Sequence, residues 1–479
     1  MRRRDFIGAG LAAGLGATGA CGGPRPAASG GALRVVVPGS FDPEASVDDP
    51  GTARALLTSL TQRGLVARDR DGAIVPGLAR TWAVTEDGLT YMFRLRPNLR
   101  RADGSPIEAA DVVERLARAR ADATVRPELR ALSLLTGIAS PAPGMVQLDL
   151  AQPNPALLGW LALPALAIAP RGANPPASGP FALADIMARD LRLTPNAAYH
   201  DATRVQLGEV HLEAVGDAAR AIARFRDGAA DIVTGAALDG LVEARAMGRG
   251  ALHIEPGWGS YGLRVSRASA LLKDPQVRNA LALAIDRTAL ISRQFGALAG
   301  MAPAHGPVPP GLGAPGDEPD WAALPIEVRR ARAATLLQAA GWSPETTLDL
   351  VAAIPPGEEH AAIISEVAGQ LAPFGLRLRV RPLPPPDMAA AAVVPDGVDL
   401  VATEILAPVD DPAWFVATLW PEHPEPWSEA ARLQLAASDS WIGLLTPVRW
   451  SLVRAGIEGW VPNIAGAHPL ELLGVAPRG

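Results

Sequence analysis

Short apolar runs alternate with amphipathic stretches along the chain, which is the pattern of a mixed α/β protein without long repeats. Residues 33–38 are apolar and predict a strand, and residues 50–64 have helical spacing that ends at a glycine. Residues 82–95 predict a β-hairpin, because the Asp87-Gly88 pair supplies the positive φ of a tight turn. Residues 107–121 place apolar side chains on one helical face and charged ones on the other, so they predict an amphipathic helix.

The second half of the chain predicts alternating helices and strands. Helical spacing covers residues 278–291, 329–341 and 359–374, and strand patterns cover 347–353, 376–381 and 398–403. A strand, a helix and two further strands form the unit that makes right-handed crossovers, so we expect a largely parallel sheet. Residues 301–319 are rich in proline and glycine and predict a long surface loop.

The chain opens with arginines followed by an apolar run. Residues 2–4 are all Arg, and the apolar run over residues 6–20 is shorter than the roughly 20 residues of a membrane span. This is the composition of an export signal, and residues 3–7 resemble the twin-arginine signal of bacteria. We therefore expect a signal peptide over residues 1–20 and export to the periplasm by the twin-arginine route.

Residues 18–21 resemble a bacterial lipobox. The resemblance implies cleavage before Cys21 and lipidation of its thiol, so that residues 21–32 would form a flexible tether between the membrane and the folded body. Thr18 stands where leucine is usual. Cleavage by the ordinary signal peptidase, which would leave a periplasmic protein without an anchor, is the alternative.

Composition excludes several classes of protein. The 479 residues suffice for several domains, and 44 basic against 50 acidic residues give a net charge of -6, unlike the basic surface of a nucleic-acid-binding protein. One Cys can form neither an internal disulfide nor a cysteine-based zinc site. The 48 Gly and 46 Pro indicate many turns.

The common motifs of catalysis are missing. Residues 14–19 spell G-x-G-x-x-G, but they lie in the apolar leader with no strand before them, so they predict no dinucleotide site. The sequence contains no G-x-S-x-G elbow, H-E-x-x-H helix, P-loop or protein-kinase loop, and its seven His lack paired helical spacing. We expect no cofactor, no metal site and no enzymatic activity, although a hydrolase assembled from distant loops stays an alternative.

A series of short motifs runs through the mature chain in a recognisable order. The motifs lie at residues 64–66, 76–82, 87–97, 103–106, 110–113, 178–181, 224–232, 274–287, 331–342 and 396–400. In this order they resemble the extracellular solute-binding proteins of ABC importers, in the dipeptide- and oligopeptide-binding group known as family 5. The resemblance covers about residues 33–479, and no single motif is diagnostic.

The resemblance implies an α/β fold of two lobes, the type II periplasmic-binding-protein fold, with an extra α/β domain inserted in the first lobe and two hinge strands. The expected boundaries are 33–66, 173–258 and 443–479 for the first lobe, 67–172 for the inserted domain and 259–442 for the second lobe. A ligand between the lobes favours the closed state only by binding it better than the open state.

The resemblance also implies a function. The chain is expected to be the periplasmic solute-binding component of an ABC importer that captures a short peptide or another small solute and delivers it to a permease and ATPase complex. We expect a monomer that is held to the membrane by its lipid anchor and binds no nucleic acid. A binding lipoprotein that serves as a sensor or partner without import stays the alternative.

Five residues are candidates for ligand contact. Trp258 and Tyr261 lie where the chain is expected to cross between the lobes, among glycines that would admit a ligand or absorb hinge rotation. Asp410, Asp411 and Trp414 lie in a segment that resembles the acidic-Asp-Pro loop at the family's cleft. Trp414 would offer an apolar wall and Asp410 a charge, whereas Asp411 would bind ligand or cap the following helix.

Pro408 departs from the family pattern. In peptide binders the resemblance places an Asp here that holds the peptide amino terminus, and proline cannot bind an ammonium group through its side chain. Asp410 would substitute for it if the loop shifts.

Other aromatic and apolar residues are expected in the core. Six of the 11 Trp lie from Trp414 to Trp460, around a segment, 420–447, that is shorter than in the family. We expect most of these indoles, and Trp82, Phe93 and Leu95 of the hairpin, to be core residues.

Overall fold

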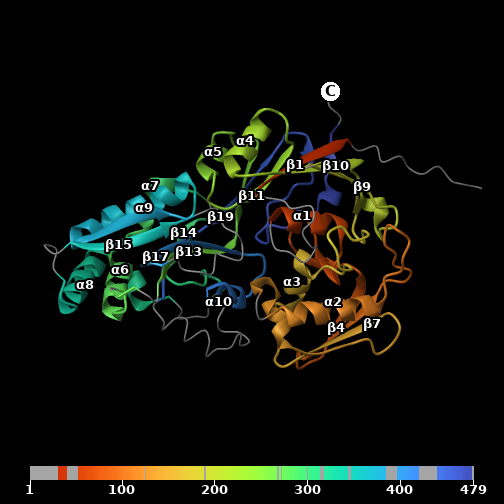
Figure 1. The fold of residues 1–479 in the computed structure, drawn as a ribbon, viewed down its shortest axis with the longest axis horizontal. Coiled ribbons are helices and arrows are strands. Elements are labelled where there is room, and N and C mark those ends of the chain that lie inside the picture. Colours follow the sequence, from red (N-terminus) through yellow and green to blue (C-terminus); the bar gives the residue numbers. More distant parts are fainter. Residues whose placement is uncertain are drawn as a thin grey trace, which may run out of the picture.

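The computed structural model describes residues 31–39, 52–123, 126–187, 190–266, 269–270, 272–298, 300–312, 318–342, 347–383, 396–419 and 440–476. Two large sheets and a smaller four-stranded sheet organise these residues (Figure 1). The leader, Cys21, most of the tether and residues 420–439 lie outside the described residues. No helix among the described residues has the length and apolar character needed to cross a bilayer.

The first large sheet has seven strands. Their order is β12 (Leu252–Pro256), β19 (Val448–Val453), β11 (Ile232–Ala236), β1 (Ala32–Pro38), β10 (Glu209–Val215), β9 (Asp190–Pro195) and β8 (Phe181–Met187). Strand β1 is parallel to β10 and β11, and the other pairs are antiparallel. A short β20–β21 pair (Ile457–Glu458 and Gly474–Val475) lies near the C-terminus.

Strand β1 is apolar because both of its faces are covered. Leu33, Val35 and Val37 pack in one cluster with Leu57 and Leu60 of α1 (Thr52–Thr61). Val36 points the other way and packs in a cluster with α4 (Ala218–Arg226) and α5 (Leu241–Arg245). A strand buried on both faces reads as a continuous apolar run, as residues 33–38 do.

The four-stranded sheet confirms the predicted hairpin. Its order is β4 (Ala79–Val84), β5 (Thr90–Leu95), β7 (Met145–Leu150) and β6 (Leu135–Ala139), with all pairs antiparallel. Gly88 in the turn has a φ of 69°. Phe93 and Leu95 are buried and Trp82 packs against the same cluster, so the hairpin side chains are core residues as expected.

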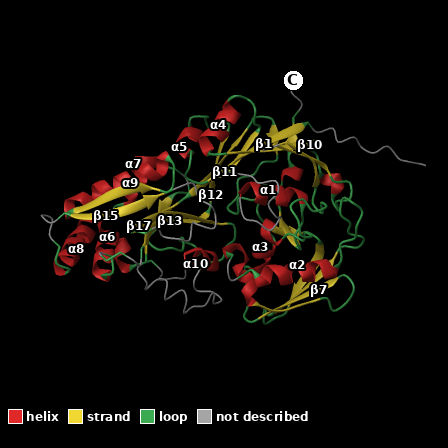
Figure 2. Cartoon of the chain, in the orientation of Figure 1, coloured by secondary structure: helices red, strands yellow, loops and turns green. Residues whose placement is uncertain are grey.

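Helices cover the smaller sheet on its inner side (Figure 2). They are α2 (Ala109–Ala121), which confirms the predicted amphipathic helix, α3 (Leu157–Leu161) and the 3-10 helix η1 (Pro127–Leu134). A two-stranded β2–β3 pair (Val66–Arg68 and Ile74–Pro76) precedes the sheet.

The second large sheet has six strands and is mixed. Its order is β14 (Ala302–Pro303), β18 (Trp441–Thr446), β13 (Trp258–Val265), β17 (Leu400–Ala407), β15 (Leu348–Ile354) and β16 (Leu376–Pro382). Strand β15 is parallel to β16 and β17, as predicted, but β13 and β18 pair antiparallel with their neighbours. The prediction of a largely parallel sheet is therefore correct only for the strands joined by the predicted crossover.

Helices α6 (Pro275–Ala284), α7 (Arg287–Phe295), α8 (Ile326–Ala339) and α9 (Glu358–Leu371) pack in one cluster with the second large sheet. The single helix predicted over residues 278–291 is wrong, because the chain breaks between α6 and α7. Ile285 has an extended ψ of 122°, and the Asp286 carboxylate accepts the Ala289 N–H at 3.0 Å and so caps α7.

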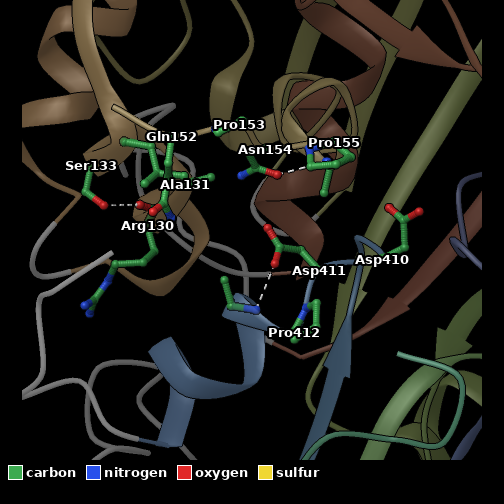
Figure 3. Close-up of a pocket in the computed structure, with 13 residues that line it drawn as sticks. Arg130, Ala131, Ser133, Gln152, Pro153, Asn154, Pro155, Asp410, Asp411 and Pro412 are labelled. Carbon is green, nitrogen blue, oxygen red and sulfur yellow. Dashed lines mark hydrogen bonds between the residues drawn. The ribbon is translucent and has the colours of Figure 1, made fainter. Parts of the chain in front are cut away.

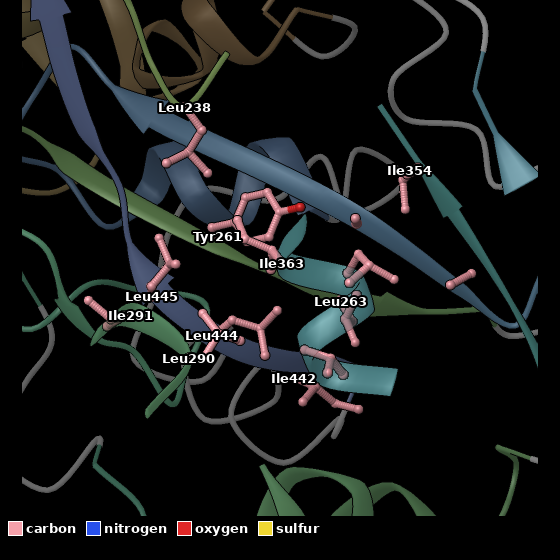
Figure 4. Close-up of a cluster of buried hydrophobic side chains, with 14 of the residues drawn as sticks. Leu238, Tyr261, Leu263, Leu290, Ile291, Ile354, Ile363, Ile442, Leu444 and Leu445 are labelled. Carbon is pink, nitrogen blue, oxygen red and sulfur yellow. The ribbon is translucent and has the colours of Figure 1, made fainter. Parts of the chain in front are cut away.

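The two large sheets are joined at two points. Only Gly257 separates β12 of the first sheet from β13 of the second, and only Pro447 separates β18 from β19. A continuous apolar core runs under both crossings and includes Leu238, Tyr261 and Leu445 (Figure 4). This is the two-strand connection that the resemblance implied, while the expected domain boundaries themselves stay a prediction.

Candidate functional site

A cavity of about 320 Å³ lies where the second large sheet meets the part of the chain that carries the four-stranded sheet (Figure 3). Three segments line it: η1, the loop between β7 and α3, and the loop between β17 and α10 (Ala413–Leu419). The lining residues are Arg130, Ala131, Ser133, Leu134, Gln152, Pro153, Asn154, Pro155, Ala156, Asp410, Asp411, Pro412 and Ala413.

The cavity wall combines prolines, alanines and Leu134 with six polar side chains, namely Arg130, Ser133, Gln152, Asn154, Asp410 and Asp411. The Ser133 hydroxyl donates to the Arg130 carbonyl oxygen at 2.7 Å, and Asn154 Oδ1 accepts the Ala156 N–H at 2.9 Å. Asp410 is the exposed acidic group of the wall, whereas Asp411 is only 6% exposed. Asp410 is therefore the carboxylate available to a solute.

The Asp411 carboxylate is used inside the protein. Oδ1 accepts the Ala413 N–H at 2.9 Å, as expected for a residue that caps α10, and Oδ2 accepts the indole N–H of Trp160 at 2.7 Å. Burial raises the pKa of Asp411 above its usual value, although hydrogen bonds from Ala413, Trp160 and Asn154 oppose the rise. The capping alternative for Asp411 is thus the one its geometry supports.

Trp414 lies behind the cavity. Its ring is 5.4 Å from that of Trp160, with 39° between the two planes, and it packs against the cores of both the four-stranded and the six-stranded sheets. Trp258 opens β13 opposite Ala407 of β17 and packs against the same small cluster as Trp414, which includes Phe415 and Trp441. Neither indole lines the cavity in this conformation.

Tyr261 is a core residue. Its side chain is 0% exposed, its hydroxyl hydrogen-bonds with His360 Nδ1 at 3.2 Å, and the two rings stack 5.5 Å apart. A ligand has no surface of Tyr261 to contact here.

Arginines surround the backbone at Pro408. Arg68 Nη2 donates to the Pro408 carbonyl oxygen at 3.4 Å, and Arg449 Nη2 donates to the Ala407 carbonyl oxygen at 3.1 Å. Burial is the main cause that lowers the pKa of Arg449 to about 10, with Glu255 opposing the change and Arg68 adding to it. The surroundings of Pro408 are therefore cationic, which is unfavourable for holding an ammonium group at this position.

The sequence identified one wall of the cavity and missed the other. It gave Asp410 and Asp411, but not Ser133, Gln152 and Asn154, which come from the expected inserted domain. Ser133 lies in η1, and Gln152 and Asn154 lie in the loop between β7 and α3. No motif surrounds them, and only the fold brings them within reach of residues far along the chain.

Nothing in the site suggests bond-making chemistry. Across the part of the chain that the structure describes, no group of three or more His, Cys, Asp or Glu side chains is placed to hold a metal ion. The geometry offers a small cavity between the four-stranded part and the loop that follows β17 of the six-stranded sheet. Two crossing strands join the six-stranded sheet to the seven-stranded sheet. This arrangement defines a binding protein of the hinged type.

The comparisons with known proteins identify the family. Residues 73–425 match the model described as bacterial extracellular solute-binding proteins, family 5 Middle. The chain belongs to this family, whose members are solute-binding proteins and not enzymes.

Two curated relatives are themselves named for peptide ligands. The chain is 26% identical over 361 residues to the periplasmic murein peptide-binding protein MppA of Escherichia coli K12, covering 69% of this chain and 66% of MppA. It is 27% identical over 304 residues to the glutathione-binding protein GsiB of Escherichia coli O1:K1, covering 60% of this chain and 57% of GsiB. The matches thus span less than two thirds of these relatives.

A solved structure confirms the fold. The Escherichia coli murein tripeptide binding protein MppA superposes with a TM-score of 0.77 at 20% identity, covering 93% of this chain and 99% of that chain. The expected two-lobed binding-protein fold is therefore confirmed.

Proposed function

We propose that this chain is the solute-binding component of an ABC importer and that it captures a peptide-like solute in the cavity between η1 and the 410–413 loop. The observation that carries the proposal is the position of that cavity. In a family 5 fold, it is built from two parts of the molecule that are distant in sequence and linked by the Gly257 and Pro447 crossings.

Capture requires no chemistry on the solute. A solute that contacts η1 on one side and the 410–413 loop on the other binds the closed arrangement better than an open one, and so shifts the population toward closure. Closure also removes the solute from water, which strengthens its polar contacts. The importer would then recognise the closed form.

The cavity wall favours a solute with apolar surface and one cationic or donor group. Prolines and alanines would contact the apolar surface, while Asp410, Ser133 and Gln152 would bind polar groups. Short peptides come first because the relatives named above bind peptides, and other amine-bearing or amphipathic solutes follow.

Export and anchoring are part of the same proposal. One of the relatives, MppA, is a periplasmic protein by name. We propose the twin-arginine route for residues 1–20 and lipidation of Cys21, with a monomer tethered beside its permease. Mass spectrometry of the N-terminal peptide from a membrane fraction tests this, because a diacylglyceryl Cys21 supports the anchor and a free N-terminus elsewhere contradicts it.

The first test of function is mass spectrometry of small molecules released from protein purified gently from the periplasm. We expect one class of peptide-like solute at about one molecule per chain. Protein that carries none, and that does not bind any member of a di- to pentapeptide library in calorimetry, would contradict the proposal.

The second test is Asp410→Asn, which removes the exposed charge of the cavity and keeps its shape. For a solute with an ammonium group we expect about a tenfold loss of affinity in calorimetry, because an ion pair with Asp410 becomes a hydrogen bond to a neutral amide oxygen. Asp185→Asn, on the exposed edge strand β8, is the matched control and should leave the affinity unchanged. Equal affinities for both variants and the parent would contradict the role of Asp410.

A further inference from the structure

Residues 409–414, here named the latch segment, cross from one part of the molecule into the core of the other. The segment follows β17 of the six-stranded sheet. Val409 and Ala413 are nonetheless 0% and 7% exposed and belong to the same apolar cluster as Phe93 and Trp160 of the four-stranded part. Separating the two parts would return this apolar surface to water, which is unfavourable.

Buried hydrogen bonds from the four-stranded part to Asp411 form the polar half of this contact, one from Asn154 and one from Trp160. The indole N–H of Trp160, which is 0% exposed, donates to Asp411 Oδ2 at 2.7 Å across 251 residues of sequence. Trp414, in the next turn of the chain, places its ring 5.4 Å from that of Trp160. Removing one partner of a buried hydrogen bond leaves the other unsatisfied, so loss of this pair would weaken the contact between α3 and the latch segment.

Two guanidinium groups hold the strand end that leads into the latch segment. Arg449 comes from β19 of the seven-stranded sheet and Arg68 from β2, and they donate to the carbonyl oxygens of Ala407 and Pro408. The end of β17 is thus contacted from outside its own sheet at consecutive residues. Ala407 pairs with Trp258 beside the Gly257 crossing, and Asp411 lies beyond Ala407 in the loop, so opening about this crossing would separate the Trp160–Asp411 pair.

We propose that Trp160 and Asp411 are positioning residues whose hydrogen bond latches residues 409–414 onto α3 and so sets the fraction of molecules that are closed before a solute arrives. Both oxygens of Asp411 are used within the protein, so the pair acts on affinity through the closing equilibrium and not by touching the solute. The latch deepens the proposed function, and its predicted effect on solute affinity rests on that function. The closing equilibrium itself can be measured without any solute.

The test is single-molecule energy transfer between dyes on the two parts. In a Cys21→Ser background, Ala110→Cys on α2 and Ala331→Cys on α8 give two exposed attachment points. Without solute we expect a measurable closed population in the parent. Trp160→Phe keeps a ring against Trp414 but loses the N–H, so it should lower the closed-to-open ratio about tenfold.

Trp450→Phe is the matched control. Trp450 is also 0% exposed, but its N–H donates to the Asp239 carbonyl oxygen at 3.0 Å, between residues that both belong to the seven-stranded part. It should lower stability without changing the closed-to-open ratio. Asp411→Asn keeps the shape of the side chain and weakens the acceptor, so it should also reduce the closed population. It provides a second measurement if Trp160→Phe folds poorly.

Two results would overturn the latch. One is a parent protein with no closed population in the absence of solute, and the other is an equal closed-to-open ratio in the parent and in whichever latch variant folds. Adding trialanine to the parent distinguishes a failure of the latch from a failure of the function proposed above. If trialanine and the peptide library leave the populations unchanged, the peptide ligand is contradicted, while the solute-free ratios still decide the latch.

Discussion

Buried charged side chains in this molecule are often satisfied by backbone groups. Arg287 is 1% exposed and donates to the carbonyl oxygens of Ala304 and Gly443 from Nε and of Ala282 and Ile285 from Nη1. Its guanidinium also lies 5.2 Å from the Trp321 ring, and burial lowers its pKa to about 9. Two of these carbonyl partners, Ala304 and Gly443, are distant in sequence, so the local pattern around Arg287 could not predict them.

Glu404 is a half-buried carboxyl that should make stability depend on pH. Burial raises its pKa from 4.5 to about 8, with Asp239 and Glu359 adding to the rise and the Leu238 N–H, which donates to it at 3.2 Å, opposing it. The folded protein therefore keeps a proton between these two values that the unfolded chain has released. This contribution to stability is complete below about pH 4.5 and is lost as the pH rises through 8.

We expect the free energy of unfolding to fall between pH 6.5 and 8 by at most about 1.4 kcal/mol per pH unit, and Glu404→Gln to remove this dependence. Urea unfolding at several pH values measures it. His360 and His200 add an opposing slope up to about pH 7.5, because burial lowers the pKa of each from 6.5 to about 4, so the test is the difference between the slopes of the parent and of Glu404→Gln. The exposed Glu86→Gln should keep the slope of the parent, and a Glu404→Gln protein with that same slope would contradict the assignment.

At the residue scale, the sequence predicted local contacts of the candidate site but not contacts between distant segments. Asp411 as a helix cap follows from local spacing, and the structure shows that bond. The partner of its second oxygen, Trp160, could not be predicted, because the two residues meet only through the tertiary fold. Tyr261 was selected for its neighbouring glycines, but its side chain lies in the core.

At the level of elements, the apolar pattern predicted the positions of strands and helices well where a segment forms a single element. Gly341 ends α8 with a φ of 86°, as its position predicted. The prediction failed where two short helices shared one continuous apolar pattern, since α6 and α7 both pack on the same core. Only the capping geometry of Asp286 distinguishes them, and an Asp within a helical pattern is not by itself a break.

The crossing at the start of β13 depends on glycine. A Cβ atom on Gly259 would lie 2.8 Å from Pro447 Cγ and 3.0 Å from the Ile405 carbonyl oxygen, neither of which belongs to a flexible side chain end. Gly259 therefore allows the two crossing strands and β17 to approach closely. Glycine is required at position 259 because a Cβ atom has no room there, and not because of its φ angle.

Gly259→Ala should lower the free energy of unfolding by about 1 to 3 kcal/mol through overpacking at the crossing. Gly369→Ala is a control of opposite sign. Gly369 lies inside α9 with open space where the Cβ would be, so alanine there should stabilise by about 0.5 to 1 kcal/mol. Chemical denaturation measures both changes, and a neutral Gly259→Ala would show that the crossing has room to adjust.

On the scale of the whole molecule, the order of motifs predicted more than any single pattern. The two-lobed fold, the family and the pairs of strands that carry the chain between the sheets were all anticipated, because these depend on chain order. The mixed character of the six-stranded sheet was not, since β13 and β18 enter it from distant parts of the sequence. The same long-range pairing builds the cavity, which is why half of its wall was missed.

The central claim is that a solute is held unchanged between two parts that close on it. Small-angle X-ray scattering of protein that has been stripped by unfolding and refolding, and then titrated with the solute pool released from it, tests this most directly. We expect the radius of gyration to decrease in a saturable, one-to-one manner, and Asp410→Asn to require about tenfold more solute for the same change. A scattering curve that stays the same at saturating solute would contradict the account.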